Sequence, residues 1–147
     1  RQVVAEDIAA LGAGIDEEDI GACVNVVLGG KVAELPAMLA SAEAVGVADI
    51  RLLRALAIRV QLLARLRAEV DGGQHPRTLV SDKRYGIFWK EVDAVSTQLR
   101  LWDAIRLARL MTLLLGCERA LKSSGTAGSV LLRRLLVDVA RQAARAR

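Results

Sequence analysis

At 147 residues, of which 53% are hydrophobic and only 3% aromatic, the chain is long enough to build one domain around a genuine core and too apolar to be a disordered tail. Its hydrophobic residues are mainly Leu, Ala and Val, and no segment alternates with period two, so the composition predicts an all-α fold. Residues 1–50 hold two basic and nine acidic side chains, whereas residues 98–147 hold ten basic and three acidic. This uneven charge distribution suits binding to charged partners, although solvent-exposed basic helix faces produce the same distribution.

The first fifty residues predict short helices separated by glycines. The apolar pattern of residues 3–11 stops at Gly12, where glycine supplies the left-handed conformation that ends a helix. Asp16 can cap the next helix, which ends before Gly29-Gly30. A further helix is predicted over residues 31–45.

The longest regular pattern covers residues 48–70. Apolar side chains recur there at three- and four-residue steps, which predicts an amphipathic helix of about six turns. Its buried face should hold Leu52, Leu56, Val60, Leu63 and Leu66. Residues 71–76 contain two glycines and a proline, so they predict a loop.

Four more helices are predicted in the second half of the chain. A short one covers residues 77–83 and a longer one residues 87–101. The next is capped by Asp103 and closed by residues 123–125. The last runs over residues 129–147, and one face of it carries Leu131, Leu132, Leu135, Leu136 and Val139.

Residue types that perform catalysis or bind metals are sparse. No GxxxxGK[ST] loop is present, and Gly29-Gly30-Lys31 lacks the glycine spacing and the hydroxyl residue of a phosphate site. His75, the only histidine, is interpreted as an exposed turn residue, and Cys117, set among leucines, as a buried and inert thiol. Glu17 and Glu18 are adjacent on a helix and point apart, which disfavours a metal site. We therefore expect no active site, no cofactor and no metal.

The few aromatic residues gather in one stretch of the chain. Phe88 and Trp89 lie at the start of a predicted helix, and Trp102 follows its end. We expect these rings to pack in the core, because they are nearly the only bulky rings that the fold has. The alternative is a stacking platform for single-stranded nucleic acid, since basic residues such as Lys90 and Arg100 are mixed among them.

Five short segments occur in an order that one known family shares. Residues 6–11 are EDIAAL, residues 15–20 IDEEDI, residues 87–91 IFWKE, residues 98–102 QLRLW and residues 118–125 ERALKSSG. Together they resemble the C-terminal part of the delta subunit of the bacterial DNA polymerase III clamp loader. The resemblance covers nearly the whole chain, which we expect to be a fragment of a longer polypeptide.

The resemblance implies the end of a small helical lid domain at residues 1–27 and a collar domain at residues 28–147. In that family the collar is a helical bundle that packs against the collars of the other clamp-loader subunits, which here would be the ATPase subunits and a delta-prime type. Packing within and between subunits would involve Leu52, Leu56, Val60, Leu63, Phe88, Trp89, Trp102, Leu132 and Leu136. The family motif would contribute Glu118, Lys122 and Gly125, the last two ending a helix.

The resemblance also implies what the chain does not do. The delta subunit has no ATPase site of its own, so the chain would be a non-catalytic part of the DNA polymerase III holoenzyme. The family opens the sliding clamp through an N-terminal domain, so this region should not bind the clamp and should meet DNA only indirectly or weakly.

Two further expectations come from the residues themselves. The most apolar stretch, residues 110–117, is flanked by charged residues and is too short to span a membrane. The sequence shows no leader of signal-peptide type, so we expect a cytoplasmic protein without a membrane partner. The alternative function is an independent helical nucleic-acid-binding protein that uses the basic C-terminal half.

Overall fold

The computed structural model describes residues 17–44 and 48–147, and all regular elements within these ranges are helical. A helical segment covers residues 17–28, and it is followed by η1 (Val32–Glu34), α2 (Leu35–Ala44), α3 (Asp49–Asp71), α4 (Pro76–Val80), η2 (Lys83–Tyr85), η3 (Trp89–Glu91), α5 (Val92–Leu101), α6 (Ala104–Ser123) and α7 (Gly125–Arg145), where η marks a 3₁₀ helix. The predicted all-α class is confirmed. The helix expected at residues 3–11, its stop at Gly12 and the cap at Asp16 lie outside the described residues.

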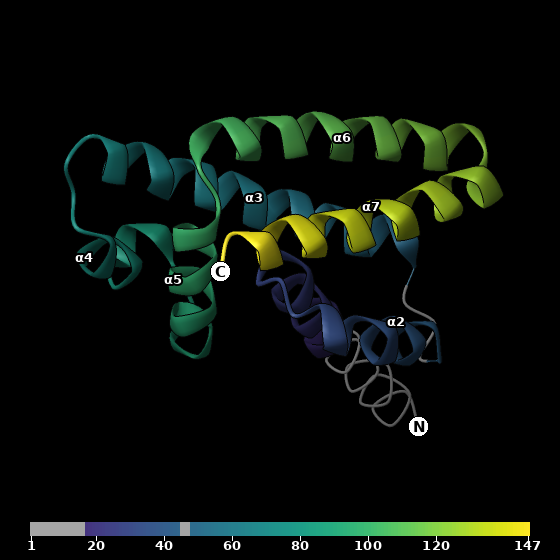
Figure 1. Ribbon diagram of the computed structural model, residues 1–147, viewed down its shortest axis with the longest axis horizontal. Helices are drawn as coiled ribbons and strands as arrows, with labels where there is room; N and C mark the ends of the chain where they lie inside the picture. The colour runs from purple at the N-terminus through teal and green to yellow at the C-terminus, as the bar shows by residue number, and fades with distance from the viewer. Residues whose placement is uncertain (1–16, 45–47) are drawn as a thin grey trace, which may run out of the picture.

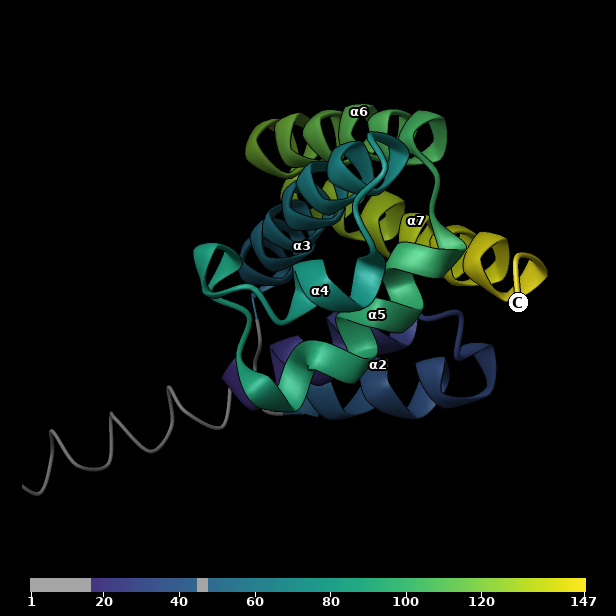
Figure 2. The ribbon, with the colours of Figure 1, turned by 90° about the vertical axis from the view of Figure 1, so that its left-hand side faces the viewer.

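Three long helices form the centre of the bundle. α3, α6 and α7 run along the long axis of the molecule, and α6 packs against both of the others (Figure 1). The helical segment 17–28 and α2 lie on the far side of α3 and α7 from α6, and α4 and α5 pack at one end (Figure 2). α3 and α7 therefore lie between α6 on one side and the segment 17–28 with α2 on the other.

The apolar stripe of α3 faces this centre. Leu52, Leu56, Val60, Leu63 and Leu66 are all buried. On α7 the buried stripe consists of Leu132, Leu135, Leu136 and Val139. Leu131 was expected on the same face but is exposed; it lies about 100° around the helix from Leu132, on the side of Leu135, which is the least buried member of the stripe. Each buried leucine contributes roughly 2 kcal/mol, so the facing stripes hold the long helices together.

The turn between α6 and α7 corrects two predictions. Ser124 alone is extended between the helices, and Gly125 begins α7 instead of ending the helix before it. The sequence predicted that the last helix begins at residue 129, but α7 begins four residues earlier, at Gly125. The cause is the close approach of α6 and α7 at Gly128, where a Cβ atom would lie 2.6 Å from the backbone of Leu121. Because glycine has no Cβ atom, the helices come close enough here for one extended residue to reverse the chain.

Other predicted boundaries move by a few residues. The helix expected over residues 31–45 is split into η1 and α2 within the described residues. The helix expected from residue 87 begins at Val92, because Gly86 has a φ of +61° and Phe88 is extended with a ψ of 135°. The short helix predicted at residues 77–83 begins and ends earlier, as α4.

The helical segment 17–28 belongs to the same core as the long helices. Val26, Val27 and Leu28 are buried in one cluster with the leucines of α3 and α7. Gly30, with a φ of +72°, approaches α7 so closely that a Cβ atom would lie 2.5 Å from the backbone nitrogen of Ala144. The domain boundary expected between residues 27 and 28 therefore falls inside one continuous helix and one hydrophobic cluster.

Candidate functional site

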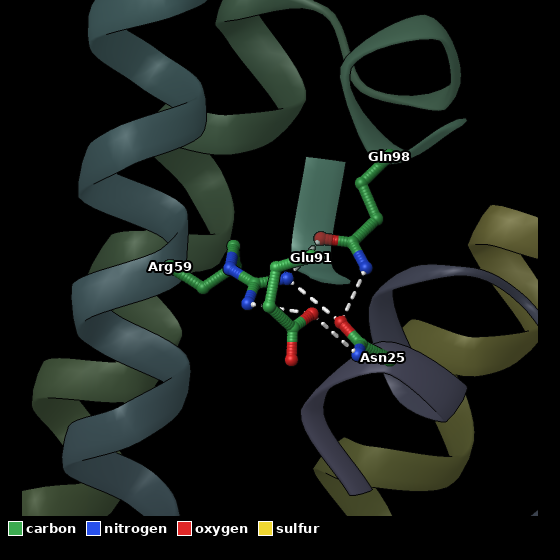
Figure 3. Close-up of polar contacts among 4 residues, drawn as sticks. All are labelled: Asn25, Arg59, Glu91 and Gln98. Atoms are coloured by element: carbon green, nitrogen blue, oxygen red, sulfur yellow. Dashed lines mark hydrogen bonds and ion pairs between the residues drawn. The ribbon is translucent and has the colours of Figure 1, made fainter. Parts of the chain in front are cut away.

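Four polar side chains from four helical elements meet at a partly buried junction, as Figure 3 shows: Asn25 from the segment 17–28, Arg59 from α3, Glu91 from η3 and Gln98 from α5. Arg59 Nη1 donates to Asn25 Oδ1 at 2.7 Å and to Gln98 Oε1 at 2.9 Å. Asn25 Nδ2 donates to Glu91 Oε2 at 2.8 Å, and Gln98 Nε2 donates to Asn25 Oδ1 at 3.0 Å. We call these four residues the polar network.

The polar network satisfies groups that burial would otherwise penalise. Gln98 is 1% exposed, and within the described residues no buried side-chain nitrogen or oxygen lacks a partner. Burial lowers the pKa of Arg59, while the ion pair with Glu91, 3.5 Å from Arg59 Nη2, acts in the opposite direction. Arginine stays protonated in proteins, amides do not titrate near neutral pH, and the Glu91 carboxylate is held by both Asn25 and Arg59, so these contacts position the elements that carry them. The polar network fixes the segment 17–28 against α3 and α5.

Sequence reasoning missed this network, although a signal for it exists. Arg59 lies three residues after Leu56 and four before Leu63, so it occupies a position on the buried stripe of α3. Gln98 lies three residues after the buried Val95 in the same way. A polar residue at an apolar-face position predicts a buried partner, but it does not identify that partner.

Two of the three aromatic residues expected in the core are on the surface. Trp89 is 75% exposed and Phe88 51% exposed, with their rings edge to face at 5.9 Å. The expectation of core packing was wrong for both, because they lie in and just before the irregular turn η3 and not on an amphipathic helix. Trp102 is fully buried, and the Arg106 guanidinium lies 4.5 Å from its ring centre.

Basic side chains surround two hollows that lie on either side of α5. The larger hollow, of about 770 Å³, is lined by Arg67 and Arg77. The smaller, of about 360 Å³, is lined by Lys31, Lys90 and Arg147. Both hollows share Asp93, Thr97 and Arg100. Lys90 Nζ also lies 5.4 Å from the ring centre of Trp89, so the exposed aromatic pair adjoins the smaller hollow.

The residues considered for other chemistry have structural roles. His75 caps α4, since its Nδ1 accepts a hydrogen bond from the backbone nitrogen of Arg77 at 3.2 Å. Burial raises the pKa of Cys23 to about 11, and burial followed by the charge of Asp49 raises the pKa of Cys117, so both thiols are protonated at neutral pH. Over the part of the chain that the structure describes, no three His, Cys, Asp or Glu side chains are grouped as metal ligands would be.

Gly29-Gly30-Lys31 also serves the fold. The Arg147 guanidinium donates two hydrogen bonds to the carbonyl oxygen of Gly29, at 2.7 and 2.9 Å. Gly29 and Gly30 are buried against the end of α7. The glycines allow close packing here.

The three residues of the expected family motif lie near the turn between α6 and α7. Glu118 pairs with Lys122 at 3.7 Å and with Arg54 at 3.8 Å. Gly125 begins α7.

No family model, curated protein or solved structure matches the chain. In the described residues, no helix has the length and apolarity that crossing a membrane requires.

Proposed function

We propose that this chain is a non-catalytic helical module that assembles with partner proteins through its surface. The observation that carries the proposal is the exposure of three large apolar side chains on two neighbouring long helices. Ile58 on α3 and Ile105 and Leu115 on α6 are each more than half exposed. Apolar side chains gathered on a surface mark contact with another protein, and burying them drives association.

The assembly that the sequence favours is the clamp loader of bacterial DNA polymerase III. Residues 87–91, 98–102 and 118–125 support this proposal by their resemblance to the delta subunit. The described helical bundle, with the segment 17–28 packed in its core, would belong to the collar, and the complex would be cytoplasmic. The ATPase subunits and a delta-prime-type subunit would be the neighbours and would supply the chemistry. DNA contact would be indirect or weak, and the sliding clamp would be bound elsewhere.

Size-exclusion chromatography with purified clamp-loader ATPase and delta-prime-type subunits tests this proposal. The chain should elute with the larger complex when these subunits are present and at its own position when they are absent. An unrelated basic helical protein of similar size is the control for charge, since the chain carries a net charge of +4. Elution of the chain at its own position in both runs would reject the clamp-loader assignment.

A second candidate function, nucleic-acid binding, is favoured by the exposed aromatic pair beside the basic hollows. Trp89 and Phe88 offer ring faces on which bases can stack, and Lys90 connects this pair to the cations of the smaller hollow. Proteins that bind single strands combine aromatic stacking with a basic groove.

Binding of labelled single-stranded DNA, measured by fluorescence anisotropy over a range of salt concentrations, tests the second function. Arg100→Ala, in both hollows, should weaken binding and reduce its salt dependence, whereas Arg133→Ala, which pairs with Glu43 on another face, should not. Trp89→Ala should weaken binding at every salt concentration. No binding by the wild-type chain at low salt would eliminate this function.

A further inference from the structure

An apolar groove runs along the surface between α3 and α6. Its volume is about 540 Å³. The buried side chains of Val60 and Leu107 form its floor, and small or flexible apolar side chains form its walls. The wall residues are Ala64 and Ala68 on α3 and Ala104, Ala108 and Met111 on α6. Alanine walls leave room for another backbone to come close.

The two helices that form the groove are antiparallel. Arg54 near the start of α3 pairs with Glu118 near the end of α6, whereas Ala68 and Ala104 line the groove together at the other end. Leu115, four residues after Met111, therefore continues the α6 wall beyond the lined hollow. Ile58 and Ile105 lie on the two edges, three residues before Gln61 and Ala108, which line the groove.

These three side chains extend the exposed apolar surface of the groove along α3 and α6. Ile58 is 68% exposed and Ile105 66% exposed. Leaving such side chains in water forgoes the roughly 1.5–3 kcal/mol that burial of each would contribute. An apolar groove between two helices fits an amphipathic helix laid into it.

The charges along the groove are mainly positive. Arg65 lines the groove. Beyond Leu115, Arg54 on α3 pairs with Glu118 on α6, and Lys122 pairs with the same carboxylate, so three cations and one carboxylate are placed along the groove. A partner that places carboxylates along the edges is therefore attracted, and one that places lysines there is repelled.

We propose that the α3–α6 groove binds an amphipathic helix of a partner protein, with branched apolar side chains in the groove and carboxylates along its flanks. This inference deepens the proposed assembly function and rests on it, since the partner is a neighbouring subunit. A nucleic-acid strand fits the groove poorly, because Gln61 and Arg65 are the polar side chains among its lining residues. A phosphate backbone needs a row of donors instead.

The chain supplies a matched pair of variants for the test. Leu113 and Leu115 lie on the same helix and are both 52% exposed, but Leu113 lines a different hollow, between α6 and α7, together with Arg106 and Arg109. Leu115→Glu places a carboxylate in the groove, and Leu113→Glu places the same charge outside it. Urea unfolding of both variants checks that neither loses its fold.

The test uses two labelled synthetic helices. The acidic helix has leucines on one face and glutamates flanking them, and in the lysine helix lysines replace the glutamates. Fluorescence anisotropy should show that the acidic helix binds the wild-type chain and Leu113→Glu alike, and Leu115→Glu about tenfold or more weakly. The lysine helix should also bind the wild-type chain about tenfold or more weakly. Equal binding of the two helices, or equal binding to the two variants, overturns the inference.

Two other occupants give different results, and both overturn the inference. If wild-type chain dimerises in sedimentation velocity and Leu115→Glu does not, a second copy occupies the groove. If unlabelled DNA displaces the acidic helix from the wild-type chain, the groove binds nucleic acid.

The clamp-loader assignment fails separately from this inference. If the acidic helix binds in the groove but no clamp-loader subunit co-elutes with the chain, the assignment is wrong and the groove still binds a helix. If the subunits co-elute equally well with Leu115→Glu, the assignment stands and the inference is wrong.

Discussion

Trp102 Nε1 donates a hydrogen bond of 2.9 Å to the carbonyl oxygen of Leu28, although 74 positions separate the two residues in the chain. The bond is buried, and it connects the end of the helical segment 17–28 to the first of the two residues between α5 and α6. A single side chain thus satisfies a helix-terminal carbonyl and fills the core where three helical elements meet. This contact makes the N-terminal segment part of the bundle.

Replacing Trp102 should destabilise the fold strongly. Trp102→Phe keeps most of the ring but leaves the Leu28 carbonyl unpaired, which should cost about 1–3 kcal/mol in the free energy of unfolding. Trp102→Ala also creates a cavity and should cost about 3–5 kcal/mol. Urea unfolding followed by circular dichroism measures both losses.

Trp89 is the control for that experiment, because it is the only other tryptophan and is largely exposed. Trp89→Ala should cost less than about 1 kcal/mol, as surface substitutions usually do. The fluorescence of Trp89 should be quenched by iodide and that of Trp102 should not. A large loss of stability in Trp89→Ala, or protection of its fluorescence, would contradict the placement of Trp89 on the surface.

Arg59→Met should destabilise the chain through the polar network. The substitution leaves Asn25, Glu91 and Gln98 without their shared donor. We expect a loss of about 2 kcal/mol in urea unfolding, below the full penalty for breaking a buried ion pair because Glu91 is partly exposed.

Arg54→Met is the matched control for Arg59→Met. Arg54 lies on the same helix but pairs with Glu118 at 3.8 Å with its own side chain 63% exposed. Its removal should cost less than about 1 kcal/mol, as for other exposed ion pairs. Equal losses in the two variants would mean that the polar network contributes no more to stability than a surface pair does.

The long helices could be predicted from the sequence because their signals are local. The stripe from Leu52 to Leu66 and the cap at Asp103, whose Oδ1 accepts from the backbone nitrogen of Arg106 at 2.8 Å, both lie within a few turns of the chain. The start of α7 could not be predicted in this way. It depends on the close approach of Gly128 to Leu121, which is a tertiary contact.

The candidate surface was predicted less well than the fold. Phe88 and Trp89 were expected in the core because large rings are usually buried, and nothing local indicates that η3 turns them outward. The four members of the polar network are separated by long stretches of chain, so the sequence shows a polar position on a stripe but not its partner. The α3–α6 groove depends in the same way on how two helices pair.

Gly128→Ala should loosen the contact between α6 and α7. The added Cβ atom would lie 2.6 Å from backbone atoms of Leu121, which cannot move without shifting the helix, so we expect a loss of about 1–3 kcal/mol. Gly116→Ala is the control, because it lies inside α6 with no atom within 4 Å of the added Cβ atom. It should stabilise the chain by about 0.5–1 kcal/mol. Thermal unfolding of both variants checks the opposite signs.

The buried thiol of Cys23 predicts a dependence of stability on alkaline pH. Burial raises its pKa from 9.0 to about 11, so the folded chain keeps a proton that the unfolded chain loses between these values. The contribution is therefore fully present below pH 9.0 and is lost as pH rises towards about 11. Over this window the free energy of unfolding should fall by about 2 kcal/mol more in the wild-type chain than in Cys23→Ala. Parallel pH profiles of the two proteins would show that Cys23 does not contribute.

Native mass spectrometry of the chain mixed with purified clamp-loader ATPase and delta-prime-type subunits tests the central proposal most directly, because it reports the composition of each assembly. The account predicts a heteromeric complex that contains the chain and that is lost with Leu115→Glu but kept with Leu113→Glu. Spectra that contain the chain only as a free species or as complexes with itself would contradict it.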